Sequence, residues 1–165
     1  MTATGTRAFD LIDYVVSSLR SASGLCAPGG VTIPVYDGPV VTNSDPSTYV
    51  LIGGYGFGDE VDEIATIDVD ASWMSLPIGA GHREERITVP CTVTGWSGGE
   101  DWSATRSNVS GAFDKVSDCL MTRSTWDGLS AVVQIVLSNM ELTQSATDLG
   151  IVVQLKFDID ATFRV

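Results

Sequence analysis

The chain has 165 residues and a formal net charge of -12 at neutral pH, from 21 acidic and nine basic side chains. This length predicts a single domain, residues 1–165, which is large enough to bury a normal hydrophobic core. A protein that grips nucleic acid through the phosphates needs clusters of lysine and arginine, and the sequence has none, which argues against specific DNA or RNA binding. No apolar run reaches the roughly 18 residues that would indicate a membrane span.

The N-terminal segment and the cysteines indicate a reducing compartment. Residues 1–16 lack the uninterrupted apolar stretch and the cleavage site of a signal peptide, so we expect a protein that is intracellular when it is made. Cys26, Cys91 and Cys119 are odd in number and irregularly spaced. This pattern favours reduced thiols in a core over a disulfide framework or a zinc site.

A helix and two short strands are expected first in the chain. Residues 7–20 carry apolar side chains at near-helical spacing, which Phe9, Ile12, Val16 and Leu19 define. Residues 31–36 and 49–53 are short apolar runs beside turn residues, as strands of a compact domain are.

A long β-hairpin is predicted next. Residues 64–74 alternate, with apolar side chains on one face and Asp68 and Asp70 on the other. Residues 86–95 are rich in β-branched side chains and alternate in the same way, although Pro90 argues for an edge position or a bulge. Residues 75–85 join these two strands and form the tip of the hairpin.

The second half of the sequence predicts another helix and two strands. After a glycine-rich turn, residues 103–120 place their apolar side chains in one helical stripe. Residues 132–140 read as a strand, and residues 150–165 alternate most clearly, with Asp158 and Asp160 on the outward side. A strand of that last length would span about 50 Å, which suggests bending or a reach onto a neighbour.

The elements together predict an α+β fold. We expect a mixed or antiparallel twisted sheet with a long β-hairpin, packed against two main helices.

Catalytic groups do not converge in this sequence. His82, the sole histidine, lies in the predicted hairpin tip, and the glycine-rich residues 53–58 are followed by acids instead of the Lys-Ser/Thr of a phosphate-binding loop. The four tryptophans are scattered, which favours packing over a sugar-binding surface. We therefore expect no enzymatic activity, no cofactor and no metal site.

Two aspartate pairs keep one chemical alternative open. Asp68 with Asp70, and Asp158 with Asp160, are pairs on one face of a strand that could hold a divalent cation or act as two carboxylates in hydrolysis. Their regular alternation with apolar residues favours a solvated sheet face.

Several short motifs, in a fixed order, carry a resemblance to a known family. They are the turn Tyr36-Asp37-Gly38-Pro39, Glu85 leading into the strand ITVPC, the acidic turn 98–101 before the long helix, and Gly150 opening a final strand that closes with Arg164. Over nearly the whole chain, their order and spacing resemble the tail terminator, or tail completion, proteins of long-tailed bacteriophages.

The resemblance implies a structural virion protein that assembles in the host cytoplasm and is found at the tail–neck junction. Its subunits would form a homo-hexameric ring that caps the tail tube, ends tube polymerisation and binds the neck or head-completion protein. A head-to-tail ring needs heterologous contacts, which long hairpins and strands can supply.

The same resemblance points to two functional surfaces. The hairpin tip would contact the tail tube protein, and the candidate apolar anchors there are Leu76, Pro77 and Ile78. Double-stranded DNA would pass through the lumen without specific binding, and a conduit of this kind should present negative charge. The candidate lumen acids are Asp68, Asp70, Asp158 and Asp160, or the acidic run of residues 59–63.

Two alternatives remain open at this stage. Another ring protein of the same neck, such as a head–tail joining or stopper protein, would share the size, the acidity and the lack of catalytic groups. A small acidic metal-binding hydrolase would use one of the aspartate pairs, and it would be a monomer or dimer that Ca²⁺ or Mg²⁺ stabilises.

Overall fold

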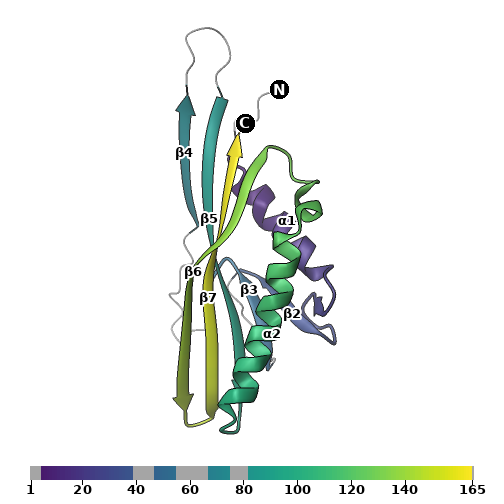
Figure 1. Ribbon diagram of the computed structural model, residues 1–165, viewed down its shortest axis with the longest axis vertical. Coiled ribbons are helices and arrows are strands. Elements are labelled where there is room, and N and C mark those ends of the chain that lie inside the picture. Colours follow the sequence, from purple (N-terminus) through teal and green to yellow (C-terminus); the bar gives the residue numbers. More distant parts are fainter. Residues whose placement is uncertain (1–4, 39–46, 55–66, 75–81, 165) are drawn as a thin grey trace.

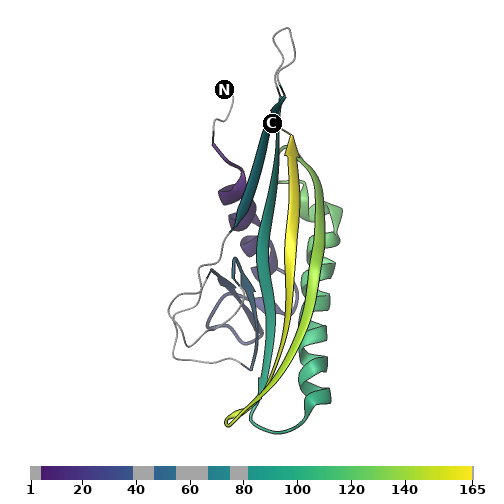
Figure 2. The same ribbon diagram turned by 90° about the vertical axis from the view of Figure 1, so that its left-hand side faces the viewer.

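The molecule is an elongated, strongly twisted β-sheet with two helices packed on one of its faces (Figures 1 and 2). A computed structural model describes residues 5–38, 47–54, 67–74 and 82–164. The helices are α1 (Ala8–Arg20) and α2 (Trp102–Met121), and a short 3-10 helix, η1 (Arg123–Trp126), follows α2. The strands are β1 (Leu25–Cys26), β2 (Ile33–Asp37), β3 (Thr48–Ile52), β4 (Asp68–Met74), β5 (His82–Ser97), β6 (Val132–Thr147) and β7 (Gly150–Arg164). The predicted α+β class, with a mixed twisted sheet and a long hairpin, is confirmed.

β5 is the strand around which the sheet is built. The strand order is β1-β2-β3-β5-β7-β6, and β4 pairs with β5 as well. β7 runs beside β5 along almost its whole length, whereas β3 and β4 share the other side of β5. β1, β2 and β3 are parallel to one another, and all pairings that involve β4, β5, β6 and β7 are antiparallel.

Pro90 lies inside β5, so the expectation of an edge strand or a bulge at this residue is wrong. β4 pairs with β5 as far as Thr88, and β3 starts its pairing at Cys91, which leaves Pro90 between the two partners. The carbonyl of Pro90 points into this gap and accepts backbone hydrogen bonds from Gly53 and Gly54 at 2.8 and 3.0 Å. No strand on that side requires the N–H that proline lacks.

The core lies between the sheet and the two helices. In α2 the buried residues are Thr105, Val109, Ala112, Val116 and Leu120, which agrees with the predicted stripe. In α1 they are Ala8, Leu11, Val15, Val16 and Leu19, so the predicted stripe was partly wrong. Phe9 is 72% exposed because a stripe that starts one residue earlier has the same helical spacing and faces the sheet.

A buried carboxylate on β5 links this strand to the start of α1. Glu85 is fully buried, and its carboxylate accepts a hydrogen bond from the guanidinium of Arg83 at 2.7 Å. The same carboxylate accepts hydrogen bonds from the backbone N–H of Arg7 at 3.1 Å and from the hydroxyl of Thr6. Arg7, the N-cap residue of α1, makes no side-chain cap of its own. Glu85, 78 positions away, therefore satisfies the backbone at the start of this helix.

Replacing Glu85 by alanine should cost about 3–5 kcal/mol of unfolding free energy, because the variant loses the buried carboxylate that Arg83 and the start of α1 share. Urea denaturation measures this loss. Glu84→Ala is the matched control, since the neighbouring carboxylate forms only partly exposed pairs with Arg86 and Arg164, and it should cost less than about 1 kcal/mol. Equal losses in the two variants would contradict the role of Glu85.

Candidate functional site

The second face of the sheet, which points away from the helices, is the candidate functional surface. Residues directly opposite one another on antiparallel strands project to the same side. One row across four strands runs from Asp68 through Thr88 and Asp160 to Val136. The next row runs from Asp70 through Arg86 and Thr162 to Gln134. We call this surface the polar face; it comprises Asp68, Asp70, Glu84, Arg86, Thr88, Gln134, Val136, Ser138, Asp158, Asp160, Thr162 and Arg164.

All four acids that were predicted to line a lumen lie on the polar face, but their exposure differs. Asp68 and Asp70, on β4, are exposed, and they form no ion pair within the described part of the chain. Asp160 is half-buried, and Asp158 is only 8% exposed. The outward orientation is therefore correct for all four, whereas the expectation of a solvated carboxylate is wrong for Asp158.

Asp158 and Asp160 bind the neighbouring strands through hydrogen bonds. Asp160 accepts one from the Thr88 hydroxyl of β5 at 2.6 Å and one from the Ser138 hydroxyl of β6. Asp158 accepts one from the side-chain amide of Asn139 at 2.8 Å. These contacts give both carboxylates a structural role in holding β5, β7 and β6 together. Sequence reasoning missed this role, because it depends on which residues face each other across strands.

Asn139 marks an irregularity in β6. Its φ is +50°, a left-handed conformation that asparagine tolerates better than most residues do. The pairing of β6 with β7 shifts between Ser138 and Glu141, which places Asn139 in a β-bulge. The bulge turns the Asn139 amide towards Asp158. The polar pair Ser138-Asn139 inside an otherwise apolar run was the only signal of it in the sequence.

Arginine side chains supply the positive charge of the polar face, close to the end that holds β4. Glu84 lies 3.2 Å from the guanidinium of Arg86 and 3.7 Å from that of Arg164. Both arginine side chains are more than half exposed. Glu84 offsets only one of these two positive charges, but Asp68, Asp70, Asp158 and Asp160 lie on the same face, so acids outnumber bases on the polar face.

The alternative of a metal site gains no support from this surface. Among the residues that the structure describes, no three His, Cys, Asp or Glu side chains gather so that they could hold a metal ion. Asp160 accepts hydroxyl hydrogen bonds on both of its oxygens. His82 begins β5 opposite Met74, and its side chain lies outside the described residues.

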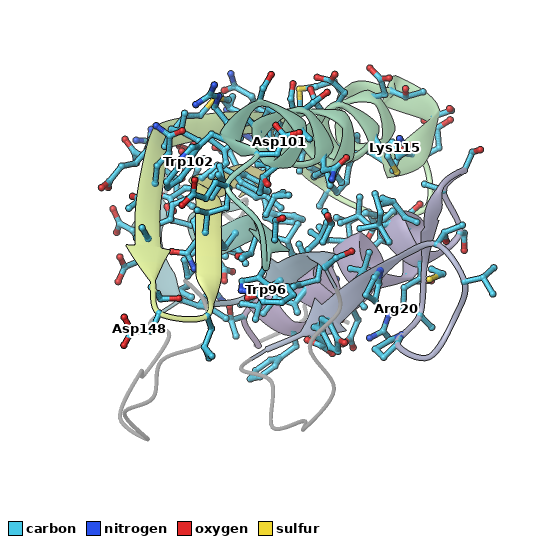
Figure 3. All side chains as sticks on the ribbon, turned by 90° about the horizontal axis from the view of Figure 1, so that it is seen from below. Arg20, Trp96, Asp101, Trp102, Lys115 and Asp148 are labelled. Carbon is cyan, nitrogen blue, oxygen red and sulfur yellow. The ribbon has the colours of Figure 1, made fainter. Side chains whose placement is uncertain are left out.

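The three tryptophans whose side chains the structure describes do not form a common surface. Trp126 is buried, stacks on Tyr14 with ring centroids 6.1 Å apart and donates its indole N–H to the Leu120 carbonyl at 2.5 Å. Trp102 is half-buried and Trp96 is 42% exposed. Seen from below, Trp102 and Trp96 lie well apart, and Asp148 is across the molecule from the basic residues Arg20 and Lys115 (Figure 3).

The predicted tube anchors Leu76, Pro77 and Ile78 lie outside the described residues, as do the acidic run of residues 59–63 and most of the glycine-rich segment 53–58. The hairpin that carries the anchors is confirmed up to its last described pair. β4 and β5 are paired in antiparallel register from Asp68 with Thr88 to Met74 with His82.

A groove of about 600 Å³ lies between the end of α2, η1 and the start of β6. We call it the β6 groove; its apolar lining includes Leu120, Met121, Trp126, Leu129, Val132 and Val133. Met121 is 48% exposed and Val133 is 57% exposed. No local pattern in the sequence predicts this groove, because three elements that are separate in the chain form it.

The cysteines lie in different environments. Cys91 is fully buried in the core, as expected, whereas Cys26 and Cys119 are half-buried. Burial raises the pKa of the Cys91 thiol well above its ordinary value, and the negative charge of Asp158 adds to the rise, although a backbone hydrogen bond from Gly53 opposes it. Burial also raises the pKa of the Cys119 thiol. Neither environment produces the reactive thiolate that a nucleophilic cysteine needs.

The raised pKa of Cys91 predicts a pH-dependent loss of stability. The unfolded thiol ionises near pH 9.0 while the folded one stays protonated, so its contribution is complete below pH 9 and falls as the pH rises further. Between pH 8 and pH 10, the wild type should lose about 1.4 kcal/mol of unfolding free energy more than Cys91→Ala. Urea denaturation at both pH values measures the difference. Parallel losses in the two proteins would show that Cys91 ionises as easily in the folded state.

Comparisons with known proteins leave the function to be argued from the geometry. No family model matches the sequence, and no curated protein matches it either. Neither helix in the described part of the chain combines the length and the apolar character that crossing a bilayer requires.

Proposed function

We propose that this protein is a bacteriophage virion subunit that forms a hexameric ring at the tail–neck junction. The ring caps the tail tube, ends its polymerisation and joins the tail to the neck or head-completion protein. The observation that carries the proposal is the polar face, a surface at the β4 end of the sheet with the helices packed on its opposite side and with four aspartates oriented towards it.

The dimensions and charge of the polar face suit the wall of a DNA conduit. The polar face runs from Glu84 to Thr88 on β5 and from Asp158 to Arg164 on β7, which at roughly 3.3 Å per residue gives a surface about 20 Å long. Further along the same side of β5, Thr92 and Thr94 are buried. Acidic side chains on such a wall repel the phosphates of double-stranded DNA, so the DNA passes without sticking. Hydrogen bonds from Thr88, Ser138 and Asn139 hold the inner aspartates in place.

We expect the tube contact at the end of the β4–β5 hairpin. Both strands reach one end of the molecule, beside the C-terminal end of β7 (Figure 1). Residues 75–81 join these strand ends and include Leu76, Pro77 and Ile78. In this proposal these apolar side chains bind the last ring of the tail tube.

The assignment is tested by the mass of the purified protein, from light scattering over a concentration series, and by electron microscopy of the largest species. Six-fold rings with a central hole, either free or on the ends of added tail tubes, are expected. A monomer that ignores tubes and gains thermal stability with Ca²⁺ or Mg²⁺ would overturn the proposal in favour of the hydrolase.

Substituting both Leu76→Asp and Ile78→Asp should abolish tube capping while the protein remains folded, because two charges replace the apolar anchors. Tube length after assembly in the presence of each protein is the measurement. Val31→Asp is the control, since Val31 is fully exposed at a distant loop and this change also adds negative charge. Normal capping by the double variant would remove the hairpin tip from the proposal.

Reversing the charge of Asp68 and Asp70 to lysine should make the protein bind double-stranded DNA at low salt, with an affinity that falls steeply as salt is added. A gel-shift titration measures this binding. Asp114→Lys with Asp118→Lys changes the net charge equally on the exposed side of α2 and should bind more weakly. Equal binding by the two double variants would mean that only net charge matters, and not the polar face.

A head–tail joining or stopper protein of the same neck is the second candidate, since the polar face would suit any ring through which DNA passes. The partner separates the two functions. A tail terminator binds the end of the tail tube, whereas a joining or stopper protein binds on the portal side and leaves tube length unchanged.

A further inference from the structure

Besides the two-residue strand β1, the sheet has two strand edges without a partner among the described residues. β6 pairs only with β7 there, and β4 pairs only with β5. An exposed strand edge presents unpaired N–H and C=O groups and is a template for pairing with another chain. From these edges we infer that β4 of one copy pairs with the first half of β6 of the next copy. This inference rests on the proposed ring and identifies the contact that builds it.

The two edges lie at the same height on opposite sides of the sheet. Asp70 is level with Arg86, Arg86 with Thr162 and Thr162 with Gln134, so β4 and the first half of β6 are at one end of the molecule (Figure 1). Rotating a copy about an axis along the strands therefore brings its β4 beside β6 of its neighbour.

The strand directions fit this pairing. β4 is antiparallel to β5, β5 to β7, and β7 to β6. β4 and β6 consequently run in opposite directions, so a neighbour's β4 continues the alternation as another antiparallel strand. Each copy pairs its β4 with one neighbour and its β6 with the other. This is a heterologous contact, of the kind that can close into a ring.

Apolar side chains on the helix side of both edges would meet in the same contact. Val69 pairs with the buried Ile87 and therefore points to the helix side, yet it is 43% exposed, because β4 lies beyond the helices. On the other edge, Met121 and Val133 remain exposed in the β6 groove. Val69 is level with Ile135, which lines that groove. A neighbour's β4 would bury these surfaces together.

The charges of the two edges favour β4 against β6 over β4 against itself. β4 presents Asp68 and Asp70, and in an isologous pair of β4 strands these acids would face their own copies, which is destabilising. β6 has one charged residue, Glu141, and it lies in the second half of the strand. The first half of β6 therefore accepts the acidic edge without like-charge repulsion.

Paired cysteines on the polar face test the contact. Asp68 or Asp70 on β4 is replaced by cysteine together with Gln134 or Val136 on β6, which gives four double variants. These combinations cover the level register and a shift of two residues either way. Cys26 and Cys119 are changed to serine throughout, and the buried Cys91 is kept. A disulfide forms only where the Cβ atoms come within about 3.5–4.5 Å.

At least one double variant should oxidise into a ladder of covalent species that ends at the ring size on a non-reducing gel and collapses with reductant. At micromolar protein, cross-linking should be roughly a hundredfold faster than in the single-cysteine variants, because the contact raises the local thiol concentration. Failure of all four pairs would overturn the edge pairing. Rapid dimerisation of the single variant Val136→Cys would overturn it too, because it would show that β6 of one copy pairs with β6 of another.

Electron microscopy of the same samples separates this inference from the proposed function. Rings that form without cross-links in any of the four variants would leave the ring in place and overturn the β4–β6 contact. Covalent chains that never close into rings would support the contact and overturn the ring on which it was built.

Discussion

The buried carboxylate of Glu85 determines how the helical layer sits on the sheet. An ionised group without solvent is stable only when its partners are close and well oriented. Here the partners are Arg83 on the same strand and Thr6 and Arg7, which lie just before α1, so the carboxylate is satisfied in one placement of the helix. At the other end of α1, Arg20 donates to the Val35 carbonyl of β2 at 3.0 Å. The helix is thus tied to two different strands, and the core between them follows from those two attachments.

Much of this architecture follows from local patterns, and the exceptions have physical reasons. The stripe of α2 and the alternation of β7 were readable because each element buries one face only. The second half of β6 was not, because residues 141–147 are mostly polar and all exposed, and they form a strand only through their pairing with β7. At Phe9, two stripes of equal spacing competed, and only the position of the sheet decides between them. The expectation for Pro90 was wrong because β5 accommodates a proline at this position only through the arrangement of two other strands. The pairings of β4 and β3 with β5 stop on either side of Pro90.

For the candidate site, too, local sequence patterns predict one part and miss another. Alternation alone places the four aspartates on one side of the sheet, since that depends on the period of a strand. It does not distinguish Asp68, which is exposed, from Asp158, which is buried beside Asn139. That distinction comes from residues far apart in sequence, as does the β6 groove. The polar face therefore combines exposed acids, which supply a negative field, with buried ones, which hold the strands together.

The gap in strand pairing at Pro90 affects how the sheet transmits force. β3 and β4 both pair with β5 on one side, but in separate stretches, so the hydrogen-bond ladder on that side is interrupted between them. A force applied to β4 is transmitted to the rest of the molecule through β5 and the continuous pairing of β5 with β7. The β4 end should consequently open to hydrogen exchange on its own, ahead of the strands that the helices cover. Force from a neighbour would pass along the β5–β7 pair, and the β1–β3 corner would carry little of it.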